Sequence, residues 1–576
     1  MCGICGFAGE GGDREHLARM TLSLAHRGPD GEGLHADPDN RVFLGHRRLA
    51  ILDLAGGGQP MWTADRRLAI VFNGEIYNHA DLRTTLQARG HRFQTDHSDT
   101  ETLLHGYREW GEALPERLNG MFAFVIHDLD RKRLFAARDR FGKKPFFYHH
   151  HPRRFVFASE LTALRLHPAI PGDLDPVVLQ KYLAYGFIPA PNALYRGCRK
   201  LPGGHWLTLD LTSFTLRLHA YWKFRLTPDP AWKERREEEL AEELQALLTQ
   251  AVRRRMESDV PLGLFLSGGI DSSAILSLAA RHAPPSTLHT FSIGFAEPSY
   301  DESAYARSEA QRVGARHREE ILTLERARAM LPELLGRLDE PLGDASILPT
   351  HLLCRFTRAH VTVALGGDGG DELFAGYDPF QALAAGRLYH RLVPGALHRG
   401  IRRLAGLLPR SGSNMSLDFK LRRFLAGVSH PMPLWNPTWM APLQPDEIAD
   451  LWHQPIDPEL LYSEALEVWQ DSEVSHPVDK TLEYFACLYL PDDILVKVDR
   501  ASMLISLEVR APFLDNDVVA FARRLPHEFK MRRGVRKYLL KRAMTGLLPD
   551  TIIHRKKKGF GIPVAEWLET VPESPP

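Results

Sequence analysis

The sequence predicts two folds in one chain: an α+β domain of layered antiparallel sheets with helices, followed by an α/β parallel-sheet domain with a helical C-terminal part. Three observations carry this prediction. The first part is rich in short strand-like runs, strand and helix patterns alternate from about residue 260, and helical patterns dominate from about 380 to 550. Such changes in the secondary-structure pattern indicate separate domains, each with its own hydrophobic core.

The N-terminal domain is predicted over residues 1–215. Runs such as RLAIVFNGEIYN (67–78) and RRFVFASE (153–160) mix apolar and polar residues at strand lengths, and Gly, Pro, Asn and Asp separate them. Helical patterns interrupt these runs at HADLRTTLQARG (79–90) and DTETLLHGYREWG (99–111). This texture favours antiparallel sheets with a few covering helices.

The C-terminal domain is predicted over residues 259–565, after a charged helical segment, 216–258, that connects the two domains; 566–576 is a tail. Strand-like and helical runs alternate here, in VPLGLFL, SSAILSLAARHA, LHTFSIGF and VTVAL. Alternation of this kind is typical of a parallel sheet with crossover helices.

Composition excludes several classes of function. The 576 residues include 72 Lys and Arg against 72 Asp and Glu, so no global field attracts nucleic acid or an anionic membrane. No apolar run approaches the about 18 residues of a membrane span. Five scattered cysteines fit a reducing compartment better than a disulfide framework. We therefore expect a cytoplasmic protein that acts on small molecules.

The run LFLSGGIDSSAI (264–275) is the strongest motif. A buried strand ends in Ser267-Gly268-Gly269, and a helix starts at Asp271-Ser272-Ser273. Backbone N–H groups and hydroxyls therefore converge at the positive end of a helix, which suits an anion such as a phosphate. The run lacks the Walker A pattern, and Asp271 suits a Mg²⁺ that bridges to phosphates.

A second acidic glycine loop follows the strand in VTVALGGDGGDELFAGY (361–377). It presents Asp368, Asp371 and Glu372 on a glycine frame. Both loops project from the carboxyl edge of a parallel sheet, where ligands bind. Two carboxylate-bearing loops around one triphosphate predict Mg²⁺, with Asp271 and Asp371 as its ligands.

The N-terminus, MCGICGF, predicts a nucleophile. If the initiator methionine is trimmed, Cys2 carries a thiol beside a free α-amine, whose ordinary pKa of about 7.7–8.0 suits a general base. The Asn73 side chain and the Gly74 N–H are candidate donors to an oxyanion. Arg48 suits a carboxylate, whereas Glu75 and Asp99 suit an ammonium group. This combination predicts glutamine as substrate.

The motifs MCGICGF, HRGPDGEG, GHRRLAILDL and NGEIYN resemble the class II glutamine amidotransferase domain of N-terminal-nucleophile hydrolases, and SGGIDSS resembles the loop of N-type ATP pyrophosphatases. Joined, they resemble the family of glutamine-hydrolysing asparagine synthetases over nearly the whole chain. The resemblance implies that the first domain releases ammonia from glutamine. It also implies that the second adenylates the aspartate β-carboxylate, so that ammonia reaching it through an internal tunnel displaces AMP.

The resemblance also implies roles for individual residues. It makes Cys2, Asn73, Gly74, Asp368 and Lys557 catalytic. It assigns glutamine binding to Arg48, Leu49, Ala50, Ile51, Leu52, Asn73, Gly74, Glu75 and Asp99. It assigns ATP binding to Phe265, Ser267, Gly268, Gly269, Asp271, Ser272, Ser273, Ile293, Gly366 and Gly367. Lys557 has lysines on both sides, at 556 and 558, and Asp368 stands where some members carry a glutamate.

Three functions remain open at this point. The first is glutamine-dependent asparagine synthesis, with Mg²⁺ as cofactor, glutamine, aspartate and ATP as partners, and a homodimer left open. The second is a ligase of the same architecture that amidates another carboxylic acid, such as a sugar acid, a peptide or a natural product. The third is a non-catalytic nucleotide or glutamine sensor, against which Cys2, Asn73 and Asp271 argue. The cysteine pair in CGIC has no second pair or histidine partner at zinc-finger spacing, and the histidines in YHHHPRR are typical of a solvated hairpin tip.

Overall fold

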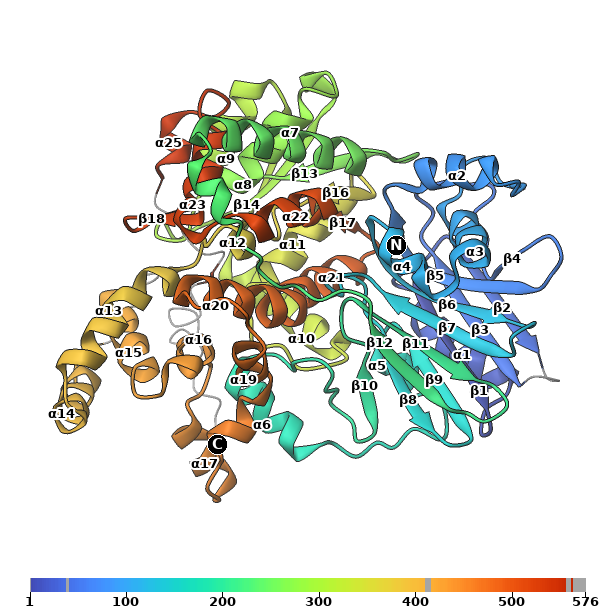
Figure 1. The fold of residues 1–576 in the computed structure, drawn as a ribbon, viewed down its shortest axis with the longest axis horizontal. Coiled ribbons are helices and arrows are strands. Elements are labelled where there is room, and N and C mark those ends of the chain that lie inside the picture. The colour runs from blue at the N-terminus through green and yellow to red at the C-terminus, as the bar shows by residue number, and fades with distance from the viewer. Residues whose placement is uncertain (1, 38–40, 410–415, 556–560, 563–576) are drawn as a thin grey trace.

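A computed structural model describes residues 2–37, 41–409, 416–555 and 561–562. In Figure 1 the N-terminal domain, in blue to green, lies beside a second domain in green to red. None of the helices in the described ranges is long and apolar enough to cross a membrane.

The N-terminal domain contains two six-stranded antiparallel sheets. Sheet 1 has the order β10 (Cys198–Lys200), β8 (Phe147–His151), β9 (Arg154–Ala158), β1 (Gly3–Gly9), β3 (Val42–Arg48) and β2 (Gly31–Asp37). Sheet 2 has the order β12 (Leu216–Ala220), β11 (His205–Asp210), β7 (Arg133–Arg138), β6 (Gly120–Asp128), β5 (Leu68–Ile76) and β4 (Met61–Trp62). The helices of this domain are α1 (Arg14–Ser23), α2 (His79–Ala88), α3 (Asp99–Trp110), α4 (Leu114–Arg117), α5 (Leu161–Leu164) and α6 (Pro176–Tyr185).

The two sheets pack face to face and have helices on their outer faces. Ile4 and Val42 of sheet 1 and Val71 and Val125 of sheet 2 lie in one buried cluster between the sheets. Residues one position along point to the outer faces, because side chains alternate along a strand. There, the outer face of sheet 1 packs on α1 and α5, and that of sheet 2 packs on α3. This layering confirms the predicted α+β domain.

The C-terminal domain is built on sheet 3, whose five strands are parallel. Their order is β15 (Arg316–Leu322), β14 (His289–Phe295), β13 (Leu262–Phe265), β16 (Val363–Leu365) and β17 (Glu508–Arg510). One face packs on α7 (Glu237–Arg255), α8 (Ile270–Ala279) and α9 (Ser303–Val313). The other face packs on α10 (Leu324–Arg337), α11 (Ile347–Arg358) and α21 (Leu495–Met503). The predicted α/β domain is confirmed.

The rest of the second domain is mostly helical, as predicted. Its elements are α12 (Gly370–Leu373), α13 (Asp378–Leu392), α14 (Gly395–Gly406), α15 (Leu417–Gly427), α16 (Trp435–Met440), α17 (Pro445–Trp452), α18 (Pro458–Leu461), α19 (Ser463–Gln470), α20 (Pro477–Tyr484), α22 (Asn516–Arg524), α23 (His527–Lys530), β18 (Met531–Arg532), β19 (Val535–Arg536), α24 (Tyr538–Ala543) and α25 (Asp550–Ile553). A π-helical stretch, Phe485–Ile494, joins α20 to α21.

The segment 216–258, expected to connect the domains, divides between them. Its first strand, β12, pairs with β11 in sheet 2. Its long helix, α7, buries Leu240, Leu244 and Leu248 in the core of the C-terminal domain. The boundaries at 215 and 258 stay predictions, although the charged helix belongs by its packing to the second domain.

Candidate functional site

Cys2 lies at one end of the sandwich, immediately before β1. Since Ile4 and Ala8 of β1 point between the sheets, the alternation of the strand directs Cys2 to the same side. The residue is only 7% exposed, and burial raises the pKa of its thiol above the ordinary value. Its Sγ faces the Leu49 carbonyl oxygen at 4.0 Å. A base beside this thiol is therefore needed to form the thiolate.

Asn73 approaches Cys2 from the other sheet. Its Oδ1 accepts a hydrogen bond from the Cys2 backbone nitrogen at 3.0 Å. Its Nδ2 is buried and has no hydrogen-bond partner among the described residues. At Gly74, the next residue of β5, a Cβ would lie 2.1 Å from the Met121 carbonyl oxygen, so a side chain does not fit. An amide donor is thus held ready at the nucleophile.

Residues 48–52, predicted to line the glutamine pocket, belong to a loop that is held by its own contacts. The Arg48 guanidinium donates to the Leu54 carbonyl at 2.9 Å and to the Asp53 carbonyl at 2.7 Å. The Ala50 N–H donates to Asp30 at 2.9 Å. Arg48 therefore shapes the loop directly, in addition to any contact with a carboxylate.

Glu75 and Asp99 lie close together and are both buried. Burial raises the pKa of Glu75 well above its ordinary value, although Arg510 opposes this at a distance of 3.3 Å. Burial also raises the pKa of Asp99, which accepts a hydrogen bond from the Ile76 N–H at 3.2 Å. Two buried carboxylates that lie close together disfavour ionisation of each other. An added cation such as an α-ammonium group relieves this repulsion, so the pair forms a strong site for it.

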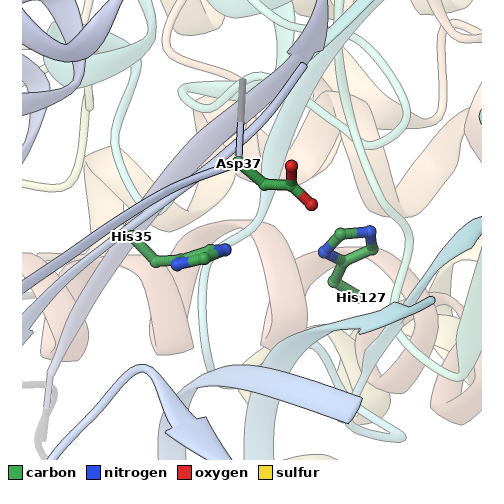
Figure 2. A group of neighbouring side chains, drawn as sticks. All are labelled: His35, Asp37 and His127. Carbon is green, nitrogen blue, oxygen red and sulfur yellow. The ribbon is translucent and has the colours of Figure 1, made fainter. Parts of the chain in front are cut away.

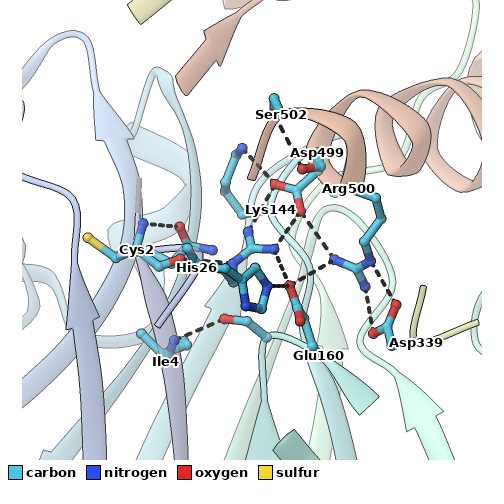
Figure 3. Close-up of polar contacts among 12 residues, drawn as sticks. Cys2, Ile4, His26, Lys144, Glu160, Asp339, Asp499, Arg500 and Ser502 are labelled. Atoms are coloured by element: carbon cyan, nitrogen blue, oxygen red, sulfur yellow. Dashed lines mark hydrogen bonds and ion pairs between the residues drawn. The ribbon is translucent and has the colours of Figure 1, made fainter. Parts of the chain in front are cut away.

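A buried ion network lies behind Cys2 and crosses between the domains (Figure 3). Arg27 donates from Nε to the Cys2 carbonyl oxygen at 3.1 Å, and its other nitrogens bind Asp499 of α21 at 2.9 and 3.1 Å. Lys144 also binds Asp499, at 3.1 Å. Burial opposes ionisation of Asp499, but these cations outweigh it and hold the pKa of that carboxyl below its ordinary value. The nucleophile is thereby tied to the second domain.

The two acidic loops of the C-terminal domain meet at one point of sheet 3. From the central strand β13 the chain winds outward through β14 and β15, then returns to β16 on the other side. The strand order thus reverses between β13 and β16, and such a switch point opens a crevice at the carboxyl ends of the strands. Loop 266–269 follows β13 and loop 366–369 follows β16. A cavity of about 880 Å³ lies there.

Most of the residues predicted for ATP binding line this cavity. They are Phe265, Ser267, Gly269, Asp271, Ser272, Ile293, Gly366 and Gly367, together with Asp368 and Asp371. Gly268 and Ser273 are not on its wall. Gly268 has a φ of +67°, and a Cβ there would meet Tyr305 at 2.5 Å, so the residue shapes the turn. Ser273 is fully buried in α8 behind it.

The SGGIDSS loop is closed by its own hydroxyl groups. The Ser267 N–H donates to Ser272 Oγ at 3.2 Å, and the two hydroxyls lie 3.1 Å apart. Gly269 is the N-cap of α8 and has no side chain to cover the helix end. The loop therefore presents backbone N–H groups and hydroxyls to the cavity, as an anion requires.

Asp271 and Asp371, the predicted magnesium ligands, face each other across the cavity. Lys537 Nζ lies between them, 2.5 Å from Asp271 and 2.7 Å from Asp371. Burial opposes its charge, but both carboxylates outweigh burial and raise the pKa of Lys537. A Cβ at Gly370 would lie 2.8 Å from Asp271, so glycine leaves room for the carboxylates. The two carboxylates offer the oxygen ligands that Mg²⁺ prefers, at a position between them that Lys537 Nζ takes in this structure.

Asp368 lies deeper and faces a lysine of the other domain. Burial raises the pKa of Asp368, and the strongest opposing charge is that of Lys143, from the loop after β7. Burial lowers the pKa of Lys143 to about 7. Its Nζ is buried and has no hydrogen-bond partner in the described part of the chain. No sequence motif pointed to Lys143, which the fold brings to the second site.

A small apolar cluster connects the surroundings of Cys2 with the second domain. Leu49 and Met121, beside Cys2 and Gly74, pack with Val363 of β16 and Met503 of α21. The cluster thus runs from the nucleophile to the strand whose loop carries Asp368. Lys557, and the lysines at 556 and 558, lie outside the described residues, so the structure says nothing of their position.

Comparisons with known proteins match both domains. The asparagine synthase family model matches residues 243–573, and the glutamine amidotransferase domain model matches residues 1–222. The chain is 34% identical over 580 residues to Asparagine synthetase [glutamine-hydrolyzing] 1 of Bacillus subtilis, covering 98% of this chain and 88% of the relative. It is 33% identical over 537 residues to Putative asparagine synthetase [glutamine-hydrolyzing] 2 of Methanocaldococcus jannaschii, covering 88% and 98%.

Proposed function

Since the chain belongs to the asparagine synthase family, we propose that it makes asparagine from aspartate, ATP and glutamine. One observation carries this proposal above the others. The nucleophile site around Cys2 and the cavity between the two acidic loops occur in one chain, and the buried cluster of Leu49, Met121, Val363 and Met503 extends from the first site into the second domain. A glutaminase coupled to an adenylating enzyme requires that arrangement.

Glutamine hydrolysis begins with Cys2. Once Met1 is removed, the α-amine of Cys2 accepts the thiol proton, and Sγ attacks the side-chain amide carbon of glutamine. The Asn73 Nδ2, without a partner in the described structure, and the Gly74 N–H stabilise the oxyanion. Ammonia leaves with a proton from the α-amine, and water then hydrolyses the thioester to glutamate. Glu75 and Asp99 hold the α-ammonium group of the substrate.

The second reaction takes place in the cavity at the switch point. The β-carboxylate of aspartate attacks the α-phosphorus of ATP, and pyrophosphate leaves. Ser267, Gly269 and Ser272 bind the pyrophosphate through N–H and hydroxyl groups. Mg²⁺, held by Asp271 and Asp371, would neutralise phosphate charge when bound. Ammonia then attacks the mixed anhydride and AMP leaves, with Asp368 placed to accept the proton that the new amide loses.

The route of ammonia is part of the proposal. A neutral molecule crosses apolar surroundings far more readily than ammonium does, because burying an unpaired charge is costly. The cluster of Leu49, Met121, Val363 and Met503 provides such surroundings between the sites. We therefore expect ammonia to cross here without meeting bulk water.

Product analysis tests the function. Glutamine labelled with ¹⁵N in its amide, ATP and aspartate should yield ¹⁵N-asparagine, AMP and pyrophosphate in equal amounts, measured by mass spectrometry. ADP and phosphate as products would contradict adenylation. A panel of other carboxylic acids in place of aspartate is the control, and faster amidation of one of them would move the proposal to that acceptor.

We also propose where the protein acts and in which oligomeric state. The five cysteines are all free, which suits a reducing cytoplasm where ATP and amino acids are available. A homodimer remains part of the proposal, and light scattering of the purified chain tests it.

A further inference from the structure

Three side chains that can ligate a metal meet in the N-terminal domain, far from both sites above (Figure 2). They are His35 and Asp37 of β2 and His127 of β6, and one ligating atom of each lies within 4.8 Å of the others. The strand register sets their position. Asp37 lies opposite Val42, and Val42 lies opposite Ala8, at the end of β1 that is remote from Cys2.

All three side chains point into the layer between the sheets. Ala123 and Val125 of β6 lie in the buried cluster there, and alternation directs His127 to the same side. His35 pairs with Leu44, which lies in the same cluster. Sheet 1 therefore contributes two polar side chains and sheet 2 one, next to the apolar cluster that fills much of the layer.

Two of the imidazole nitrogens have no protein partner among the described residues. His35 Nε2 and His127 Nδ1 are both buried and accept or donate no hydrogen bond there. His127 is only 1% exposed. Buried polar atoms nearly always have a hydrogen-bond partner, so two such nitrogens facing one carboxylate indicate a site for a ligand. Trp62 packs edge-on against the His35 ring at 4.8 Å and limits what can enter from that side.

We propose that His35, Asp37 and His127 bind a divalent transition-metal ion of the zinc type, with a water as fourth ligand. Two imidazoles and one carboxylate are a common zinc set, with bonds of about 2.0–2.2 Å. The potential ligand atoms of the three side chains already lie within 4.8 Å of one another.

The ion would act as a structural clamp. Its ligands come from both sheets, so binding ties the two faces of the sandwich together at the end opposite Cys2. A metal that binds only the folded domain stabilises it by mass action. No step of the proposed synthesis passes through this site, so its test is independent of turnover.

Zinc content is the primary measurement. Untagged protein is treated with chelator, dialysed against a small excess of Zn²⁺, freed of loose metal and measured by plasma mass spectrometry. We expect about one zinc per chain, and less than a tenth of that in His127→Gln and His35→Gln. Asp37→Asn should weaken binding at least about tenfold. Absence of stoichiometric zinc, or its retention in both histidine variants, would overturn the proposal.

Three matched controls exclude other zinc-binding groups. His527→Gln changes a second group of potential ligands, His476, Asp479 and His527, in which His476 already accepts a hydrogen bond from the Val478 N–H. His150→Gln changes the exposed histidine run, and Cys2→Ala removes the reactive thiol. All three should keep the zinc, and loss of zinc in one of them would assign it there instead.

A second readout covers variants that fold poorly. Co²⁺ in a four-coordinate site gives visible absorption that free cobalt lacks, so wild type should show it without any mutation. Zn²⁺ should also raise the melting temperature of the wild type and of His150→Gln, but not that of His35→Gln. Equal shifts in all three proteins would show non-specific binding and contradict the site.

Discussion

Cys2 combines a buried thiol with a backbone nitrogen 3.0 Å from Asn73. Cys2→Ala keeps a small residue there but removes the nucleophile. Glutamine-dependent synthesis should fall by at least about 10³-fold, because no thioester forms. Synthesis from ammonium salts should persist at high pH, because the second cavity does not use the thiol. Assays with both nitrogen sources on one preparation measure this, and loss of both activities in a folded variant would contradict it.

Asn73 has two roles in the same side chain. Its Oδ1 holds the Cys2 nitrogen, while its Nδ2 has no partner in the described structure. Asn73→Ala should lower kcat for glutamine by about 10²–10³, the usual effect of losing one oxyanion donor, and leave ammonia-dependent synthesis intact. Asn78→Ala is the matched control, since that side chain donates to the Arg117 carbonyl and accepts from the Asn119 N–H. Equal effects in both variants would indicate a general loss of structure.

Lys143 is buried without a hydrogen-bond partner among the described residues, and burial lowers its pKa to about 7. In the unfolded chain Lys143 keeps its proton up to about pH 10.4. The stability of the folded state therefore rises with pH between about 7 and about 10.4. Lys143→Met should therefore be more stable than wild type at pH 7, by a few kcal/mol in order of magnitude, and the gain should fade towards pH 10.4.

The same variant should lose synthesis from either nitrogen source, because the charge of Lys143 acts on Asp368. Melting temperatures at pH 7 and pH 10, with ammonia-dependent rates, test both halves of this prediction. A stabilised variant with full activity would make Lys143 a packing residue only. Arg131→Met, on the exposed turn between β6 and β7, is the control.

The sequence predicted the residues that stand next to one another in motifs, and missed those whose partner lies in the other domain. Asn73, Gly74 and Glu75 follow in one run, and Asn73 does contact Cys2. Lys143 has no local pattern, because its environment is made by Asp368, more than two hundred residues away in the chain. The zinc-type cluster of His35, Asp37 and His127 was invisible for the same reason, since two sheets must pack before it exists.

At the scale of elements, the loop after β13 depends on one glycine. Gly268 has a φ of +67°, and a Cβ would lie 2.5 Å from Tyr305 Cβ and 2.7 Å from the Ala306 nitrogen. The neighbouring Gly269 has a φ of −79°, and its nearest contact would be Ser267 Oγ at 3.3 Å. The two glycines therefore differ sharply in what a methyl group would do.

Gly268→Ala should raise the KM for ATP strongly, because left-handed backbone costs about 1–2 kcal/mol outside glycine and the clash adds to it. Gly269→Ala should change the KM for ATP much less. Glutamine hydrolysis without ATP should be normal in both variants. Steady-state kinetics of pyrophosphate release measure the difference, and equal KM values would show that the turn is not what positions the nucleotide.

Elements with a clear apolar pattern were predicted, including the short strands β13 and β16, but a short charged strand was not. The strands β5 and β6 and the helices α3 and α8 follow their patterns. The strand β17 has three residues, two of them charged, and lies in a stretch expected to be helical. Only its pairing with β16 makes it a strand. The charged helix α7 showed its apolar spacing, but the sequence could not tell which domain would cover that face.

At the scale of the whole molecule, two buried contacts tie the sites together. Arg510, at the end of β17, pairs with Glu75 at 3.3 Å, while its carbonyl accepts the Gly366 N–H at 2.8 Å. One residue thereby touches the predicted glutamine pocket and the second ATP loop. Arg27 in turn joins the Cys2 carbonyl to Asp499. A rearrangement around the cavity thus has a direct route to the nucleophile.

Asp499→Asn tests that route. The change leaves Arg27, Lys144 and Arg500 with one anion fewer in a buried network, and breaking such a pair costs about 3–5 kcal/mol. We expect glutamine hydrolysis to continue while less of its ammonia reaches the second site. The ratio of glutamate to asparagine formed should therefore rise above the wild-type value. Asp130→Asn, which changes an exposed pair with Arg67, should leave the ratio unchanged.

Acid should weaken the same buried network as Asp499→Asn does, because it protonates the Asp499 carboxylate. The cations hold the pKa of Asp499 below its ordinary value, so the folded state keeps the carboxylate where the unfolded chain protonates it. The stability that this charge contributes is complete above the ordinary value of about 3.9 and is lost as pH falls below it. Denaturant unfolding should give a larger free energy of unfolding for wild type than for Asp499→Asn at pH 7, and this difference should narrow below about pH 4. If this difference in the free energy of unfolding stayed constant from pH 7 to below about pH 4, the carboxylate charge would not stabilise the domain interface.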